Sequence, residues 1–336
     1  MTQADPDRIQ LHPTGIDLFS ICGEAWRRRY EENEREGVSA ELVVGSAVDV
    51  AITADLMEKI KTGQLLPLPS VVGIAQDEVR RRRLPNDEYL LTRASRFVAY
   101  AHRQLCPQIN AVSVQHSWSV RLDKMLTRRG GLRGRWKKID LVGTLDIREH
   151  YQDFSGSGIA IRDIKTAGAS PPADAANGKH WTQLTCYALG EWVNTGAMPA
   201  RVQIDTLVDL KRGVTHKPSF GERDDFDFAA LFNRIVRFAQ ARQSGIFHYA
   251  PRGHWKCTRQ YCSFYDTCPA TKNKNTIDLA PAIPKLYKIK HVHYPSPLPA
   301  ATMLLEKATD RSVACQPQES RVISPKKPSL PSSMLK

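Results

Sequence analysis

The sequence lacks the defining features of two protein classes. Its 336 residues contain only 7 cysteines, too few for a small secreted domain built on disulfides. No run approaches the roughly 18 consecutive apolar residues of a membrane-spanning helix, and the first ten residues are polar and partly acidic, unlike a signal peptide. These absences predict a soluble cytoplasmic protein without a membrane partner. In that compartment, cysteines serve metals or packing more often than disulfides.

Acidic residues are also in short supply. The chain has 35 Asp and Glu against 48 Lys and Arg, a net charge of +13. Residues 281–336 hold 9 of the 21 prolines and 9 Lys and Arg against 3 acidic residues, which predicts a disordered basic tail. Removing the +6 of this tail leaves +7 on residues 1–280. The folded part is therefore basic in its own right, as expected for a protein with a polyanionic partner.

The hydrophobic pattern predicts an α/β fold. Apolar periodicity favours helices over residues 15–32, 41–60 and 71–105, the last broken at Leu84-Pro85. Runs rich in Val, Ile and Leu then predict strands over 111–122, 139–149 and 159–165, joined as a meander. A helix over 180–193, a strand over 201–211 and a helix over 225–243 follow. This order indicates an α/β core with an N-terminal helical part, in which residues 56–110 form a helical insertion.

The last strand of the predicted meander carries a carboxylate and an ammonium group. Side chains alternate along a strand, so Asp163 and Lys165 share one face while Ile164 faces the other way. Asp146 ends the apolar run of the preceding strand, and hairpin pairing would bring it beside Asp163. Two such carboxylates can hold Mg²⁺, and the lysine can orient a water molecule. Alone, an Asp-x-Lys strand is more often a solvated ion pair.

Three short motifs together resemble a known family. Gly143-Thr-Leu-Asp146, Asp163-Ile-Lys165 and Gln183-Leu-Thr-Cys-Tyr187, in this order, are similar to the RecB-type branch of the PD-(D/E)XK nuclease superfamily. The resemblance implies a restriction-endonuclease-like core, a mixed β-sheet flanked by helices, that cleaves DNA with Mg²⁺ or Mn²⁺. It implies metal ligation by Asp146, Asp163 and the backbone carbonyl of Ile164, activation of water by Lys165, and support of the catalytic site by Gln183 and Tyr187.

An upstream helix of that branch commonly carries a further metal ligand in a Gly-x-x-x-His setting. The sequence here reads Gly45-Ser-Ala-Val-Asp49. Because a carboxylate suits Mg²⁺ at least as well as an imidazole, Asp49 is the predicted third metal ligand. The alternative is a polar residue that interrupts the apolar stripe of a helix. Asp55 is a weaker candidate.

Cysteines are clustered near one end of the predicted domain. Cys257, Cys262 and Cys268 fall within twelve positions of a predicted closing loop, residues 254–270, and Cys22 lies near the N-terminus. This set resembles the iron–sulfur subset of the same branch, which includes AddB-like, exonuclease V-like and CRISPR-adaptation nucleases, and implies a [4Fe-4S] cluster. A zinc ion held by four thiolates and merely buried thiols are the alternatives. Cys106 and Cys186 are predicted to pack in helices, and Cys315 falls in the tail.

Basic and aromatic residues are candidate DNA contacts. Arg80–Arg83, Arg27–Arg29 and the segment 124–138 could neutralise phosphates, which gives affinity without sequence readout. Unpaired bases could stack on aromatic rings, and the candidates are Trp118, Trp136, Trp181, Trp255 and Tyr261.

The leading hypothesis is a metal-dependent deoxyribonuclease, an exonuclease acting on single strands or DNA ends. A helicase or a recombination or CRISPR protein is the kind of protein partner that the resemblance implies. A non-catalytic DNA-binding module of the same fold is one alternative, because Asp49 stands where the family has histidine. A zinc-stabilised nucleic-acid-binding scaffold is the other.

Overall fold

The computed structural model describes residues 8–34, 37, 39–82, 84, 87–122, 139–153, 156–251 and 253–272. Arg83, Trp136, the basic segment 124–138 and the tail with Cys315 lie outside the described residues. Among the helices of these ranges, none has the length and apolar character needed to cross a membrane. The elements in chain order are β1 (Ile9–Leu11), α1 (Pro13–Ile21), α2 (Gly23–Tyr30), α3 (Ala40–Thr62), α4 (Leu68–Arg82), α5 (Asp87–Tyr100), the π-helix η1 (Ala101–Leu105), the 3₁₀ helix η2 (Cys106–Gln108), β2 (Ala111–Arg121), β3 (Ile139–Asp153), β4 (Gly156–Ala167), α7 (Trp181–Thr195), β5 (Arg201–Leu210), β6 (Gly213–Gly221), α8 (Asp225–Ser244) and α9 (Pro269–Lys272).

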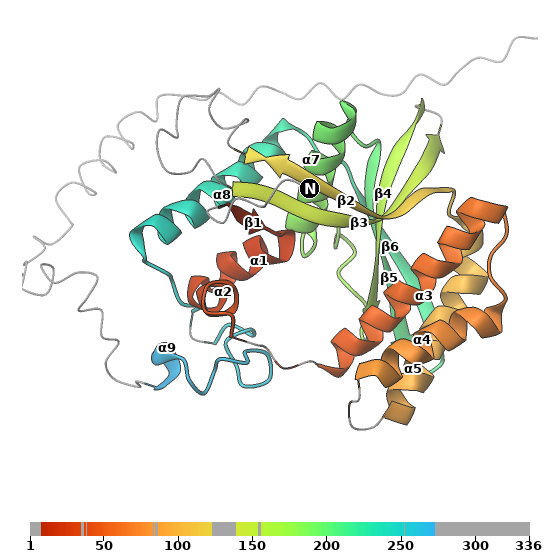
Figure 1. Cartoon of the computed structure of the whole chain (residues 1–336), viewed down its shortest axis with the longest axis horizontal. Helices are drawn as coiled ribbons and strands as arrows, with labels where there is room; N and C mark the ends of the chain where they lie inside the picture. Colours follow the sequence, from red (N-terminus) through yellow and green to blue (C-terminus); the bar gives the residue numbers. More distant parts are fainter. Residues whose placement is uncertain are drawn as a thin grey trace, which may run out of the picture. The chain divides into compact units, whose positions relative to one another are not determined.

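Six strands form one mixed sheet (Figure 1). Strands β2, β3 and β4 form the predicted antiparallel meander, and β5 runs parallel to β4 after the connection through α7. Two strands were not predicted. β6 pairs antiparallel with β5, and its His-Lys-Pro sequence at 216–218 hides the apolar pattern. β1 has only three residues and pairs parallel with the start of β3.

Helices cover both faces of this sheet. Alternate residues of β4 show the two faces, because Ile161 packs in one apolar cluster and Ile164 packs against the other. The first cluster joins the sheet to α1, α7 and α8. The second joins it to α3, α4 and α5, and the break between α4 and α5 falls at the predicted position near Leu84. The architecture is therefore the predicted mixed sheet between helical layers.

The first predicted helix, residues 15–32, is two helices in the structure. Cys22 interrupts it in an extended conformation (φ −152°, ψ 102°), ending α1 and starting α2. The backbone N–H of Glu24 donates to the carbonyl of His248 instead of continuing the helical ladder. This break also lets the Cys22 sulfur accept a hydrogen bond from the Ala25 N–H at 3.5 Å, as the N-cap of α2. Long-range contacts outweigh an uninterrupted helical pattern here.

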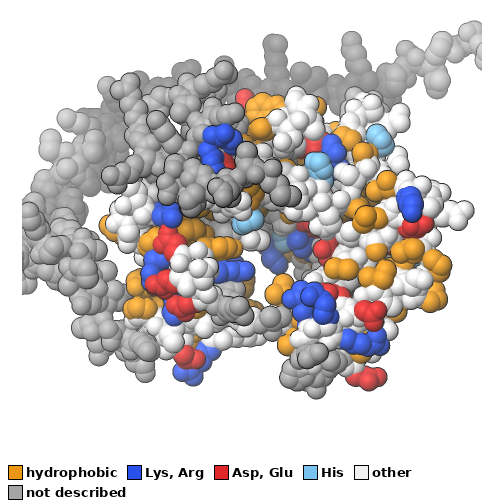
Figure 2. Space-filling model, in the orientation of Figure 1, with side chains coloured by type: hydrophobic (Ala, Val, Ile, Leu, Met, Phe, Trp, Pro, Cys, Tyr) orange, Lys and Arg blue, Asp and Glu red, His pale blue; other side chains and the backbone are white. Residues whose placement is uncertain are grey.

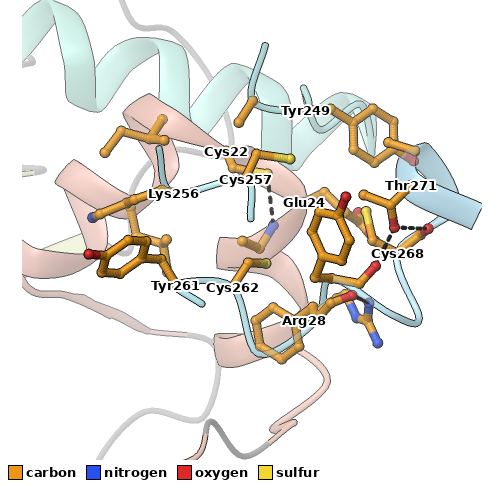
Figure 3. Close-up of a pocket in the computed structure, with 17 residues that line it drawn as sticks. Cys22, Glu24, Arg28, Tyr249, Lys256, Cys257, Tyr261, Cys262, Cys268 and Thr271 are labelled. Carbon is orange, nitrogen blue, oxygen red and sulfur yellow. Dashed lines mark hydrogen bonds between the residues drawn. The ribbon is translucent and has the colours of Figure 1, made fainter. Parts of the chain in front are cut away.

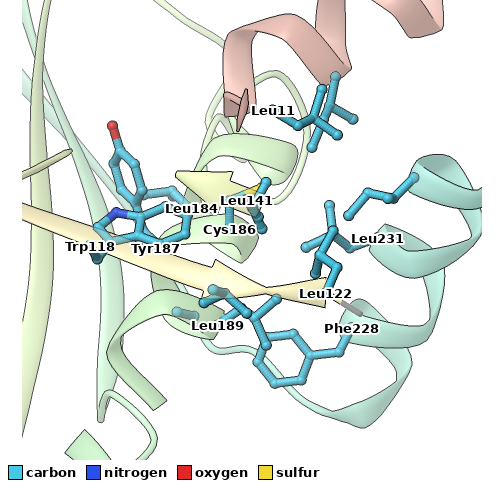
Figure 4. Packing of buried hydrophobic residues seen from close by; sticks show 14 of the residues in the cluster. Leu11, Trp118, Leu122, Leu141, Leu184, Cys186, Tyr187, Leu189, Phe228 and Leu231 are labelled. Carbon is cyan, nitrogen blue, oxygen red and sulfur yellow. The ribbon is translucent and has the colours of Figure 1, made fainter. Parts of the chain in front are cut away.

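Trp118 belongs to the core, which corrects its prediction as a base-stacking residue. Only 5% of its surface is exposed, and its ring lies with Tyr187, Leu184 and Leu141 in the first cluster (Figure 4). Two glycines make room for the indole. A Cβ at Gly143 would lie 2.7 Å from the Trp118 ring, and one at Gly190 would lie 2.5 Å from it. Glycine at position 143, in the Gly-Thr-Leu-Asp motif, is therefore explained by packing, because a side chain there would clash with the Trp118 ring.

Candidate active site

The predicted carboxylates lie where two strands of the sheet separate. The last hydrogen-bonded pair between β3 and β4 is Ile147 with Arg162, and the next position in that register places Asp146 opposite Asp163. Beyond this pair β4 continues beside β5 alone, through Ala167. The two strands thus form a fork, with one predicted carboxylate on each arm. The hairpin prediction placed this pair correctly.

The predicted side chains of β4 and α7 are in direct contact. Lys165 Nζ lies 2.6 Å from Asp163 Oδ2 in an ion pair. On the other side, Gln183 Nε2 donates to Asp163 Oδ1 at 2.7 Å and to the Tyr187 hydroxyl at 2.8 Å. Asp163 is fully buried, and its Oδ2 atom faces the ammonium group of Lys165. A buried carboxylate oxygen in this state needs a positive charge beside it.

The electrostatics of the fork favour a bound cation. The pKa of Asp146 is raised well above its ordinary value, because its carboxyl group is removed from water and lies beside the carboxylates of Asp163 and Asp49. The pKa of Lys165 is also raised: removal from water acts to lower it, but the carboxylates of Asp163 and Asp146 outweigh that effect. The lysine therefore stays protonated. Three carboxyl groups share one ammonium group, which leaves an excess of negative charge.

Asp49 of α3 approaches the fork from the face of the sheet opposite to α7. It lines a small pocket together with Thr53 of α3, Asp146 of β3 and Ile164 of β4. Removal from water raises the pKa of Asp49, with a further contribution from the charge of Asp163. Gly45, one turn earlier on α3, lies against Thr166 of β4. The separation of β3 and β4 thus lets carboxylates from both sides of the sheet act on one another.

Gln115 is a member of this site that the sequence gave no reason to select. Its Nε2 donates to Asp49 Oδ1 at 3.1 Å and to Thr53 Oγ1 at 3.2 Å. Its backbone has φ +48°, in the left-handed region, although it lies within β2 beside Asp146. A non-glycine residue rarely adopts this conformation, which is typical of functional sites. Sequence patterns do not report a backbone angle, so no signal was present.

His180 is a second neighbour of the site that sequence reasoning missed. It precedes α7, three residues before Gln183. The pKa of His180 is lowered to about 4, because removal from water and the nearby charge of Lys165 both disfavour the protonated ring. Its imidazole is therefore neutral near pH 7. The sequence marked His180 only as a helix boundary.

The donor set of the fork fits a hard divalent cation. It consists of carboxylate oxygens with an adjacent ammonium, the chemistry that Mg²⁺ and Mn²⁺ prefer. The raised pKa of Asp146, which lies beside two other carboxyl groups, points the same way. Over the described residues, no group of three or more His, Cys, Asp or Glu side chains is arranged as a metal site as it stands. The fit thus rests on chemistry and charge rather than on a preformed cage.

The four predicted cluster cysteines line a single pocket. Cys22, Cys257, Cys262 and Cys268 lie around one pocket (Figure 3). All four are free thiols. Burial raises the pKa of Cys257, and the nearness of Cys22 and Cys268 raises it further. The chain thus brings Cys22 to the pocket of the three later cysteines, but over the described residues these thiols are not arranged as a metal site as they stand. Thiolates are the type of donor found in iron–sulfur and zinc sites.

Two of the arginines predicted to contact phosphates are occupied within the protein. Arg28 is buried against the cysteine pocket, where it pairs with Glu34 at 2.6 Å and donates to the Thr267 hydroxyl at 2.6 Å. Arg27 pairs with Glu24 and Glu32. Burial and these contacts correct the prediction for Arg28, whereas the partly exposed Arg27 stays a predicted phosphate contact. Lys, Arg and His side chains do gather in a hollow near the centre of the face in Figure 2.

The structure also places the remaining predicted cysteines and aromatic residues. Cys106 and Cys186 are buried, as predicted for packing residues. Trp181 is half-buried beneath Arg234, whose guanidinium lies 4.6 Å from the ring centroid. The side chains of Trp255 and Tyr261 are exposed.

Comparison with known proteins places this geometry in context. Residues 10–269 match the family model described as the PD-(D/E)XK nuclease superfamily. A crystal structure from Eubacterium rectale, provisionally described as an exonuclease, is similar at a TM-score of 0.50 and 12% identity, covering 80% of this chain and 89% of that one. The crystal structure of SSO0001 has a TM-score of 0.33 and 14% identity, over 74% of this chain and 95% of that one. No curated protein matches. At such identities the first similarity concerns the fold alone.

Proposed function

Because the chain belongs to the PD-(D/E)XK nuclease superfamily, we propose that it is a metal-dependent deoxyribonuclease. The observation that carries this proposal is the meeting of Asp146, Asp163 and Lys165 at the fork between β3 and β4. An acidic pair with an adjacent protonated lysine offers a cation site and a positive charge with which a phosphodiester can be hydrolysed. The order of the motifs favours the RecB-type branch of the superfamily.

The residues of the fork have distinct roles in this proposal. Asp146 and Asp163 would hold the divalent cation, joined by Asp49 and by the backbone carbonyl of Ile164. When bound, the cation neutralises charge on the scissile phosphate and supplies a water of lowered pKa. Lys165, held protonated by the surrounding carboxylates, orients that water and stabilises charge that develops on the phosphate oxygens.

Gln183 and Tyr187 would support the site from α7. The Gln183 amide donates to Asp163 Oδ1, so it fixes the carboxylate and turns Oδ2 toward Lys165. The Tyr187 hydroxyl accepts the second hydrogen of the same amide. Burial raises the pKa of Tyr187, so its hydroxyl stays neutral and keeps this hydrogen bond. Both residues therefore act by positioning.

The proposed substrate is single-stranded DNA or a DNA end, cleaved as an exonuclease. The positive net charge and the basic hollow near the centre of the face in Figure 2 support a polyanionic substrate. The motif resemblance supports exonuclease action in repair or recombination, with a helicase or a recombination or CRISPR protein as partner.

A cleavage assay tests the proposal. Labelled single-stranded and double-stranded DNA, in linear and circular forms, is incubated with the protein in Mg²⁺ or Mn²⁺. We expect linear DNA to be cleaved, and Asp163→Asn and Lys165→Ala to slow cleavage by roughly 10²–10⁴-fold. Asp225→Asn and Lys217→Ala, exposed residues of α8 and β6, are matched controls that should retain activity. Circular dichroism checks that each variant folds.

Each outcome of this assay is informative. Full activity of either site variant would end the assignment of the fork as the catalytic site. Binding of DNA without any product in the wild-type protein would favour the non-catalytic DNA-binding module. Cleavage of circular substrates would replace exonuclease action by endonuclease action.

We further propose that the four cysteines of the pocket hold a [4Fe-4S] cluster. Their convergence on one cavity supports a shared metal group, and the resemblance favours iron–sulfur over zinc. Anaerobic purification followed by iron, sulfide and zinc analysis tests this. A colourless protein loaded with zinc would remove the cluster and leave a zinc-stabilised domain.

A further inference from the structure

Two aromatic side chains project into solvent from the segment that carries the later cysteines. Trp255 is 54% exposed and Tyr261 is 57% exposed, whereas Trp26 and Trp118 are core residues. The two rings form an edge-to-face pair with centroids 5.3 Å apart and an interplanar angle of 83°. Exposed large aromatics that gather in one place usually mark an interaction surface.

Turns hold this aromatic pair in place. The Cys257 N–H donates to the carbonyl of His254, and the N–H groups of Tyr261 and Cys262 both donate to that of Thr258. The Thr258 hydroxyl donates in turn to the Trp255 carbonyl at 3.0 Å. The rings are therefore presented by an ordered backbone that also positions two of the pocket thiols. Little conformational entropy would be lost when a ligand binds to them.

Positive charge accompanies the two rings. Lys256 Nζ lies 5.4 Å from the centroid of the Trp255 ring, and Figure 3 shows Lys256 and Tyr261 together at one side of the pocket. Arg259 has a side chain that is 77% exposed, and its ion pair with Asp266 is equally open to water. Such an exposed pair is weak, so a phosphate can compete for the guanidinium. Aromatic faces beside cations fit a ligand with flat rings and phosphate groups.

Lys256 relates this surface to α1 and to the start of α7. Lys256 is near enough to Asp17 of α1 to affect its ionisation, and the Asp17 carboxylate is hydrogen-bonded by the Thr182 side chain. Thr182 is the neighbour of Gln183, which contacts Asp163. Lys256, the neighbour of Trp255 in the chain, thus lies on the side of the protein where α1 meets the start of α7.

We propose that Trp255 and Tyr261 form a stacking platform for unpaired bases of a single strand whose phosphodiester lies at the fork. This inference rests on the proposed function and adds a substrate feature, because bases can stack on the platform only where they are not paired. Lys256 and Arg259 would contact the phosphates beside the stacked bases. Recognition of this kind depends on the ring faces of the bases and not on their sequence.

Fluorescence anisotropy on two oligonucleotides tests the platform. One is a labelled 20-mer of deoxythymidine, and the other is a 20-mer of abasic units with the same phosphates, both without divalent metal. We expect the double variant Trp255→Ala and Tyr261→Ala to bind the deoxythymidine 20-mer roughly 10–100-fold more weakly. Binding to the abasic 20-mer should change by less than about twofold, because its phosphate contacts remain. The substitutions Trp255→Phe and Tyr261→Phe should restore binding.

A matched control and a kinetic readout separate this proposal from the catalytic one. Tyr89→Ala with Phe226→Ala removes two other exposed aromatics, 62% and 80% exposed, and should leave binding unchanged. In the cleavage assay, the platform variant should raise KM and leave kcat unchanged. Equal losses on both 20-mers, or wild-type binding by the platform variant, would overturn the platform while wild-type cleavage still upheld the nuclease. Absence of wild-type cleavage would instead overturn the nuclease.

Discussion

The backbone of Gln115 allows a test in which a glycine variant should be more stable than an alanine variant, the reverse of the usual order in a strand. Its φ of +48° places an L-residue in the left-handed region, at a cost of roughly 1–2 kcal/mol. Glycine adopts this region freely, whereas alanine does not. Replacing Gln115 by glycine and by alanine removes the same contacts to Asp49 and Thr53. The difference in stability between the two variants therefore reports the backbone at position 115 and not the lost contacts.

The magnitude follows from two opposing terms. In an ordinary strand, alanine is more stable than glycine by roughly 0.5–1 kcal/mol. At position 115 the relief of strain outweighs that term, so Gln115→Gly should be more stable than Gln115→Ala by roughly 0.5–1 kcal/mol. Such a difference corresponds to about 1–4 °C in Tm for a domain of this size. Urea unfolding and differential scanning calorimetry measure it.

Both variants should also weaken metal binding, because Asp49 loses the amide that orients it. A hydrogen bond of this kind contributes roughly 1 kcal/mol, so half-activation in the cleavage assay should need about fivefold more Mn²⁺. Ser119, an exposed residue of the same strand, is the control, and there alanine should be the more stable substitution. If alanine is also favoured at position 115, the strain argument is refuted. An unchanged Mn²⁺ requirement would separate Asp49 from the metal site.

Three further predictions concern packing, pH and thiol reactivity. Gly190→Ala should lower the free energy of unfolding by about 1–3 kcal/mol, because its Cβ would overlap the Trp118 ring; urea denaturation measures this. His180 has a folded pKa of about 4, below its ordinary value, so the folded protein disfavours protonation and loses stability as pH falls through about 6.5 toward 4. His180→Asn should lose less stability over this range, as shown by urea midpoints. In the metal-free protein, a thiol reagent should label Cys257 before Cys106, whose burial raises its pKa, as peptide mapping would show.

Each of these has a control and a contrary result. Gly73→Ala, on α4 with open space around it, should be neutral or stabilising, so a loss there equal to that of Gly190→Ala would discount the overlap. Parallel pH profiles of wild type and His180→Asn would mean that His180 is not held neutral. Labelling of Cys106 as fast as Cys257 would contradict its place in the core.

The parts of the fold that follow from local pattern were predictable from the sequence. Alternation along a strand put Asp163 and Lys165 on one face, and hairpin register put Asp146 opposite Asp163. These relations involve residues close in sequence or paired by a short connection. They need no knowledge of how the helices pack.

The parts that depend on distant contacts were not predictable. A helical pattern runs through Cys22, but the helix is interrupted there, and the backbone N–H of Glu24 donates to the carbonyl of His248. Trp118 looked like a surface aromatic, because nothing in the sequence shows that Gly190 of α7 leaves space for its ring. Gln115 became visible only through its backbone angle. The prediction that the ends of the domain meet at the cysteines came from family resemblance and not from periodicity.

The hydrogen bonds of Arg28 to the segment 254–272 bear on which part of the protein unfolds first. This side chain of α2 holds the segment 254–272 through the Phe264 carbonyl and the Thr267 hydroxyl, and that segment contains only one short helix. Few sheet or core contacts would break if the segment detached, so we expect it to open as a sub-global unit before the sheet unfolds. Amide protons of residues 257–267 should then exchange faster than those of β4. Limited proteolysis should cut there first, and more readily in metal-free protein than in protein loaded with the cluster that we propose.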